Sequence, residues 1–350
     1  MTLAITEQQR ADLVPMLTGE VLHAFQEESQ VSYLFTPSIL QGTDTMIDRV
    51  VTQAKPVTID WTERHKSAQQ AAVGTITYEL EKSGYLRHEE KNISKLIQDV
   101  DVLMEMAREH GTAVALLYDT VIFLQLLKAS RAAAMTAAGG SVDADVDLDT
   151  VIQEGGVAGF DATNDELDVV EVVKKISLMI TYQKQRRRLP KGDSFLLVSL
   201  GLYDVLLEDD KLVSTDFSSG NGDVSRNELR VIKNIPILPV DMFQYLNDGK
   251  AAAAVSSVSA ATIDEQDKAA RAILFSNQAI RVFEAMQPTF DMFYVEGDKM
   301  NYIDTQYFFN AGIRRQDHVA ALYLFEVFNA TPSADQIDSA RINITATEVI

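Results

Sequence analysis

The sequence predicts an α+β protein with an extended hairpin and one long helix at its centre. Three observations lead to this prediction. A polar ribbon at 43–81 contains strand-like runs, a stretch from Ile93 to Ala134 carries apolar residues every three or four positions, and a mixed α/β region follows. An extended ribbon of that length has little apolar surface of its own to bury, so we expect it to lie on another molecule. The order of these segments points to an assembly protein before it points to an enzyme.

Length and composition describe a folded protein with more than one lobe. At 350 residues the chain exceeds the ~250–300 residues at which a single core usually stops growing, so we expect two lobes. Hydrophobic residues make up 46% of the chain and charged residues 23%, which is ordinary for a folded soluble protein. No apolar run reaches the ~18 residues of a membrane span, and the N-terminus lacks a basic region followed by an apolar stretch. We therefore expect a protein that is made and kept in the cytoplasm.

The chain has no cysteine and is strongly acidic. Without cysteine, disulfides, thiolate nucleophiles and thiolate metal sites are excluded. The 31 basic and 51 acidic side chains give a formal charge of −20. Such a surface repels nucleic acid, whose affinity depends on neutralising phosphates with Lys and Arg, and it keeps a protein soluble.

Two helices are predicted in the first 140 residues. Apolar residues between Leu13 and Phe25 form one stripe at helical spacing, which Gly19 interrupts. The long helix keeps one face nearly apolar from 93 to 134, and it could reach ~60 Å at 1.5 Å per residue. Gly111 within it is either a break in the helix or a site where another element approaches closely.

Strand patterns occur on both sides of the long helix. In the ribbon, strand-like runs surround a polar tip at 62–70, so the ribbon is either an ordinary hairpin with a solvated loop or a long arm whose polar face meets a neighbour. After the long helix, the patterns predict a second amphipathic helix, a buried strand, a short helix, a strand region and two strands around a turn. These elements are expected at 165–188, 194–200, 201–207, 229–240, and 290–295 with 300–309.

Motifs of catalysis were sought and not found. None of the five histidines has the H-E-x-x-H spacing or another close metal-ligand spacing. The sequence contains no P-loop and no G-x-S-x-G elbow. Acidic residues are plentiful, but no pair stands out as an acid and a base. We therefore expect no catalytic residues, no cofactor and no enzyme activity.

One acidic run has the spacing of calcium ligands. Its members are Asp143, Asp145, Asp147, Asp149 and Glu154. Oxygen ligands at positions one, three, five, seven and twelve are what a calcium loop needs. The sixth position is Leu148, however, where the tight turn requires glycine. An acidic edge strand or loop is therefore the preferred interpretation, and calcium binding is the alternative.

Charged and aromatic residues in three regions are candidates for contacts between subunits. A basic helix end at 184–188 complements the helix dipole. The alternative is an acidic neighbouring subunit, ahead of nucleic acid, because the net charge disfavours contact with phosphates. The pair at 314–315 is either a solvated loop or a symmetric contact point, and Trp61 is more typical of packing than of ligand stacking. The candidates are Arg49, Asp60, Trp61, Glu63, Arg64, Lys66, Arg186, Arg187, Arg188, Arg314 and Arg315.

Several segments, taken in order, resemble the major capsid proteins of tailed bacteriophages, particularly those of short-tailed phages. Each segment is unspecific alone, and the likeness rests on their order over most of residues 10–330. In turn they resemble an N-terminal arm, an extended loop, a long spine helix, a strand pair and the Gly/Arg stretch that ends a peripheral domain. The segments are Gly19–Phe25, Thr43–Glu81, Gly111–Val121, Leu229–Ile237 and Asn310–His318.

The resemblance implies the tailed-phage capsid fold, of the Hong Kong type that encapsulins share. The implied parts are an N-terminal arm at 1–42, an extended loop at 43–82, a peripheral domain at 83–138 and 276–312, an axial domain at 139–275 and 313–329, and a C-terminal tail at 330–350. Copies of the chain would form hexamers and pentamers of an icosahedral shell.

Partners and location follow from the same resemblance. The implied partners are further copies of the chain, a portal protein, packaged double-stranded DNA bound without sequence specificity, and no membrane. Because the arm before residue 40 is short, a separate scaffolding protein is expected, and the tail from Ala330 to Ile350 could clasp a neighbour. The implied location is the virion capsid, assembled in the host cytoplasm.

Three other classes of protein remain open at this point. An encapsulin-like nanocompartment shares the fold but holds a cargo enzyme. A soluble α/β enzyme that uses carboxylate chemistry would be a monomer or small oligomer with a pocket. A calcium-binding interaction protein would depend on the acidic run at 143–154.

Overall fold

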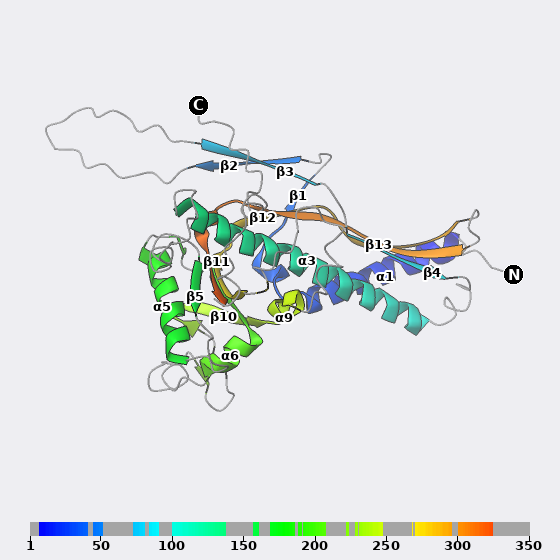
Figure 1. Cartoon of the computed structure of the whole chain (residues 1–350). Helices are drawn as coiled ribbons and strands as arrows, with labels where there is room; N and C mark the ends of the chain where they lie inside the picture. Colours follow the sequence, from blue (N-terminus) through cyan, green and yellow to red (C-terminus); the bar gives the residue numbers. More distant parts are fainter. Residues whose placement is uncertain are drawn as a thin grey trace.

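The computed structural model describes most of the chain in segments. These are residues 7–40, 45–51, 73–80, 84–90, 100–137, 157–160, 169–185, 188–190, 192–207, 222–223, 228–229, 231–247, 268, 270–295 and 300–324. Helix α3 runs through the middle, with a long narrow lobe around its first half and a compact lobe around its second half (Figure 1).

Helix α3 (Val100–Ala137) is the predicted long helix, and its 38 residues span ~57 Å. Its first half exposes one side, whereas from Tyr118 to Ser130 every residue is buried. A helix with this burial is surrounded by protein on all sides. Among the described helices, the stretch Asp101–Ser130 alone is long and apolar enough to cross a membrane, but 72% of its apolar window is buried within the protein, as in the core helix of a globular domain.

The narrow lobe consists of two helices on one face of a four-stranded sheet. The sheet has the order β1 (Ser38–Ile39), β12 (Ile280–Val295), β13 (Met300–Ile313) and β4 (Gly84–Glu90), with β1 parallel to β12 and the other pairs antiparallel. Helix α1 (Glu7–Glu28) and the first half of α3 bury Leu17, Val21, Leu103 and Ala107 against Phe290, Met292 and Ile303 of the sheet.

The compact lobe is a six-stranded mixed sheet with helices on both faces. Its order is β5 (Val157–Phe160), β14 (Val319–Leu324), β11 (Ala270–Ser276), β6 (Ser194–Ser199), β10 (Ile235–Val240) and β9 (Val231–Ile232). Helices α5 (Val169–Gln185) and α6 (Leu200–Leu207) cover one face, while α3 and α9 (Met242–Asn247) cover the other.

Both faces of this sheet are buried, which explains the composition of its strands. Leu196 and Leu274 pack toward α5, while the alternate residues Leu197 and Ile273 pack toward α3. Because successive side chains of a strand point to opposite faces, a sheet that is covered twice needs apolar residues at almost every position. The apolar run at 194–200, which predicted a buried strand, is therefore continuous because helices cover both faces of the sheet.

The polar ribbon forms an antiparallel hairpin in its described part. Strands β2 (Thr45–Val51) and β3 (Val73–Glu79) pair from Thr45 opposite Glu79 to Val51 opposite Val73. The predicted polar tip at 62–70 lies outside the described residues. A second small pair, β7 (Gly222–Asp223) with β8 (Glu228–Leu229), lies within the predicted strand region or just before it. The 3₁₀ turns η1 (Ser32–Leu34) and η2 (Gln316–His318) follow α1 and β13.

Three sequence expectations about these elements need correction. Helix α1 continues through Gly19, which does not interrupt it. Helix α3 does not break at Gly111; the alternative of a close approach is correct, because a Cβ there would lie 2.6 Å from the carbonyl oxygen of Val21. Strand β12 begins at Ile280 rather than at Phe290. Two irregularities between Glu284 and Thr289 shift the register and break the alternation of the sequence, although the pairing with β13 continues on both sides of them.

A buried carboxylate fixes the end of α1 to α3. Asp119 of α3 is 2% exposed, and it accepts hydrogen bonds from Ser29 Oγ at 2.5 Å and from the backbone N–H of Gln30 at 2.7 Å. Burial raises the pKa of Asp119 from 3.8 to about 6, although these hydrogen bonds oppose the shift. The contact holds the chain where it leaves α1 and turns toward β1.

A buried histidine joins α3 to two neighbouring strands of the narrow sheet, β13 and β4. His110 is 2% exposed, with its Nδ1 2.7 Å from Thr305 Oγ1 of β13 and its Nε2 2.6 Å from His88 Nδ1 of β4. Burial, and then the neighbouring His88, lower the pKa of His110 from 6.5 to about 4. Its contribution to stability is therefore present above pH 6.5 and is lost as the pH falls through about 4.

A pair of identical substitutions tests the close packing of α1 on α3. We expect Gly111→Ala to destabilise the subunit by about 1–3 kcal/mol, because the new Cβ would also lie 2.7 Å from Ala24 Cβ. Gly19→Ala is the matched control: nothing lies within 4 Å of its Cβ, so the gain in helix propensity should stabilise by about 0.5–1 kcal/mol. Urea unfolding followed by circular dichroism measures both. Equal stabilisation by the two substitutions would contradict the tight α1–α3 contact.

The raised pKa of Asp119 predicts an effect of pH on stability. Because the folded-state pKa is above the ordinary 3.8, the stability that Asp119 contributes is fully present below about 3.8 and is lost as the pH rises through about 6. The unfolding free energy of the wild type, relative to Asp119→Asn, should therefore rise by roughly 2–3 kcal/mol between pH 7 and pH 4. Taking the difference cancels the opposite effect of His110, which both proteins retain. A difference that does not change with pH would show that Asp119 has an ordinary pKa.

Candidate assembly surfaces

The β2–β3 hairpin is seated on the narrow sheet by one tyrosine. Tyr78 of β3 is 7% exposed, and its hydroxyl donates a hydrogen bond to the carbonyl oxygen of Ile313 at 3.1 Å. Its ring lies against Gly312, where a Cβ would be 2.2 Å from Tyr78 Cδ1, and 5.6 Å from the ring of Phe283. Burial raises the pKa of Tyr78, so the hydroxyl stays protonated and remains a donor. The hairpin is thus attached at the end of β13 that faces the compact lobe.

Arginines lie beside this seat. Arg314 Nε is 2.8 Å from Asp48 Oδ2 of β2, an ion pair without the alignment of a hydrogen bond. Arg281 of β12 is close enough for its charge to act on Tyr78, and its buried Nε has no hydrogen-bond partner among the described residues. Two guanidinium groups therefore lie at the base of the hairpin. One of them, that of Arg314, pairs with Asp48 of β2.

More arginines lie on the other side of the turn that follows β13. Arg188, just after α5, is 3.8 Å from Asp317 Oδ2 in η2. Burial lowers the pKa of His318. The positive charges of three nearby arginines, Arg188, Arg314 and Arg315, lower this pKa further, against the opposing charge of Asp317.

The two predicted basic segments therefore meet in space. Arg188 and the 314–315 pair are far apart in the sequence, yet all three act on His318. We call Arg188, Arg281, Arg314 and Arg315 the arginine cluster; the carboxylates of Asp48 and Asp317 are its partners within the described residues.

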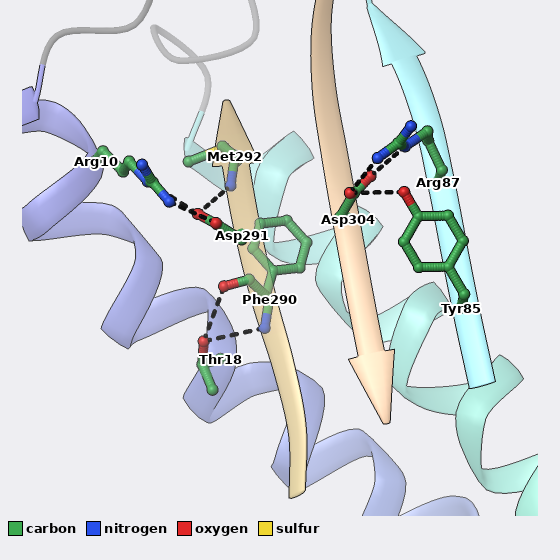
Figure 2. A network of polar contacts seen from close by, with 8 residues as sticks. All are labelled: Arg10, Thr18, Tyr85, Arg87, Phe290, Asp291, Met292 and Asp304. Atoms are coloured by element: carbon green, nitrogen blue, oxygen red, sulfur yellow. Dashed lines mark hydrogen bonds and ion pairs between the residues drawn. The ribbon is translucent and has the colours of Figure 1, made fainter. Parts of the chain in front are cut away.

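A separate polar network holds the far end of the narrow lobe (Figure 2). Asp304 of β13 is 1% exposed and accepts two hydrogen bonds from Arg87 of β4, both at 2.8 Å, and one from Tyr85 at 2.8 Å. The guanidinium of Arg87 also lies 4.8 Å from the ring centre of Tyr302. A buried carboxylate is costly unless it is paired, so these contacts fix β4 to β13.

On the opposite side of the same lobe, α1 is fixed to β12. Arg10 binds Asp291 through two hydrogen bonds of 2.9 and 2.5 Å, and Thr18 Oγ1 exchanges hydrogen bonds of 3.3 Å with the backbone of Phe290 (Figure 2). An open groove of about 570 Å³ lies along this contact. Its lining includes Glu7 besides the paired Arg10 and Asp291.

Many of the residues predicted to make contacts between subunits or to bind calcium lie outside the described residues. This applies to Asp60, Trp61, Glu63, Arg64, Lys66, Arg186 and Arg187, and to the calcium candidates at 143–154. Arg49 is described by its backbone alone, opposite Thr75 in the hairpin. In the part of the chain that the structure describes, no group of three His, Asp or Glu side chains could hold a metal ion.

Sequence reasoning missed four residues of this surface, Asp48, Tyr78, Arg281 and Gly312. Tyr78 could have been found, because an aromatic residue in a polar, alternating strand needs a surface to cover. Arg281 and Asp48 carried no local signal, since only tertiary contacts bring them to the hairpin base.

Gly312→Ala should release the hairpin from its seat, because the methyl group would overlap the ring of Tyr78. We expect amide hydrogens of β2 and β3 to exchange at least tenfold faster, with little change in β11 and β6 of the compact lobe. Tyr78→Phe is the milder control, since it keeps the ring and removes only the hydrogen bond to Ile313. Unchanged exchange in Gly312→Ala would mean that Tyr78 does not seat the hairpin.

The comparisons with known proteins concern the fold. No protein-family model matches the sequence, and no curated protein matches it. A chain of the bacteriophage PhiM1 mature capsid is 17% identical and superposes with a TM-score of 0.62, over 86% of each chain. For the capsid structure of cyanophage P-SCSP1u, the identity is 14% and the TM-score 0.61, over 83% of this chain and 86% of that chain.

A structure of Mycobacterium phage Che8 is also similar, with 12% identity and a TM-score of 0.51 over 80% of this chain and 84% of that chain. The expected fold class is therefore confirmed: this chain has the α+β capsid fold of tailed bacteriophages.

Proposed function

We propose that the protein is a structural capsid subunit that assembles into an icosahedral shell around phage double-stranded DNA. The proposal rests on the agreement of its fold with the capsid chains of PhiM1 and P-SCSP1u over more than four-fifths of both molecules. On this proposal the narrow lobe is the peripheral domain, the compact lobe is the axial domain, and the protein acts by binding rather than by catalysis.

The exposed strands support the proposal. In the described residues β2 and β3 form a two-stranded sheet, and β4 lies at an edge of the narrow sheet. A two-stranded hairpin is marginally stable alone in water, and free strand edges attract other strands. Neighbouring subunits of a shell would cover both, which a monomer could not do.

The charge of the chain fits a container more than a DNA-binding protein. A formal charge of −20 opposes tight contact with phosphates, so packaged DNA would be enclosed without being held in sequence-specific complexes. Hexamers and pentamers, a separate scaffolding protein and a portal protein belong to the same proposal. So do assembly in the host cytoplasm and a final place in the virion.

The mass of the purified protein tests the proposal. Sedimentation, with negative-stain microscopy of the fast fraction, should show megadalton spheres, tubes or sheets of hexamers, with scaffolding protein added where needed. Gly19→Ala, which changes an open position on α1, should assemble as the wild type does.

A monomer or dimer that persists when scaffolding protein is added would overturn the proposal. Shells that contain a cargo enzyme in place of DNA would keep the assembly and overturn the role as a DNA container.

A further inference from the structure

Two surfaces of opposite charge lie far apart on this molecule. The first is the arginine cluster, in which Arg314 pairs with Asp48 and Arg188 with Asp317, while the charges of Arg281 and Arg315 act on the neighbouring Tyr78 and His318. The Nε atoms of Arg281 and Arg314 are buried without a hydrogen-bond partner within the described residues, and Arg315, next to Arg314 in the chain, is half-buried. Buried or half-buried guanidinium groups left in this state favour an additional anionic partner.

The second surface is a row of carboxylates on α3. Asp101, Glu105 and Glu109 are all exposed and follow one another at intervals of four residues, which places them on one side of the helix. Asp101 complements the N-terminal dipole, but the other two lie beyond the first turn. The neighbouring Arg108 is engaged by Glu20, with Nε 2.5 Å from Oε1. Arg108 also interacts electrostatically with Glu105, but one arginine shared with Glu20 does not balance three carboxylates, so the row gains from an external cation. We call it the acidic row.

The two surfaces cannot meet within one copy. The acidic row lies beside the first half of β13, since His110 contacts Thr305 and Leu103 packs with Ile303. Arg314 is nine residues beyond Thr305, roughly 30 Å at the rise of a strand. The start of α3 and the end of β13 accordingly lie far apart along the molecule (Figure 1). That distance exceeds the screening length of about 8–10 Å in physiological salt.

We propose that the arginine cluster of one copy binds the acidic row of the next copy. Guanidinium groups bind carboxylates through short, paired hydrogen bonds, so the two surfaces match in chemistry as well as in sign. Two different patches that bind head to tail form a ring when the rotation closes. This inference rests on the proposed function and names the contact through which neighbouring copies recognise each other.

A second copy is a better partner than nucleic acid for a simple reason. The chain as a whole carries a formal charge of −20, so an extended polyanion would meet repulsion all around the cluster. A row of three carboxylates on a folded surface makes a local contact and avoids most of that repulsion.

Charge reversal tests the pairing. Arg315→Glu should lower the assembled fraction at least tenfold at low salt, as should Glu105→Lys. The two changes together should restore at least half of wild-type assembly, because one ion pair forms again with its signs exchanged. Lys174→Glu is the control, since it makes the same change in charge at an exposed position of α5 outside the cluster. Urea unfolding shows that each variant is folded.

Each other outcome has a definite meaning. If Arg315→Glu assembles as Lys174→Glu does, or if the combined variant does not recover, the pairing is wrong. If Arg315→Glu assembles normally but its shells hold less DNA, the cluster binds phosphate and the pairing is again wrong. If the wild type does not assemble, the proposed function fails, and this inference falls with it. Wild-type shells together with normal Arg315→Glu assembly would overturn this inference alone.

Discussion

The burial of the second half of α3 on all sides is the constraint on which the rest of the structure depends. Its second half lies in the core of the compact lobe, and its first half packs with α1 on the narrow sheet. A helix that is apolar around its whole circumference can stay soluble only if other elements enclose it. Residues of α3 therefore form part of the core of both lobes, and neither lobe has a complete core without this helix. This also explains why the first part of the chain is a packed helix and not a loose arm.

Polar groups on α3 fix its position relative to the elements that pack around it. His110 bonds to β4 and β13, Asp119 holds the end of α1, and Ser130 Oγ lies 3.0 Å from the hydroxyl of Tyr323 in β14. Apolar packing alone would tolerate a helix shifted by a turn, whereas a shift would leave each of these buried groups without a partner. The helix is therefore fixed near its start, middle and end.

The sequence predicted the elements better than their contacts. Periodicity located α3, the paired limbs of the ribbon and the buried strand β6, because each depends on a repeating local pattern. The prediction from periodicity failed at Gly19, where α1 continues because the neighbouring Leu17 and Val21 are packed in the core. It also failed at the start of β12, where bulges break the alternation. The arginine cluster was predicted only as two unrelated basic segments. Its existence depends on η2 lying beside the end of α5, which no local pattern encodes.

The division between an apolar interior and charged contact surfaces would suit the proposed shell, which must close correctly. Exposed ion pairs are worth about 0–1 kcal/mol each, so a single misplaced contact can dissociate and form again. Many such contacts per subunit become strong together once a shell is closed, because each additional contact forms within an assembly already held in place. A large apolar patch would bind more tightly but would also retain errors. In this protein the strong apolar contacts lie inside the subunit, around α3, and the ion pairs of the arginine cluster lie outside that core.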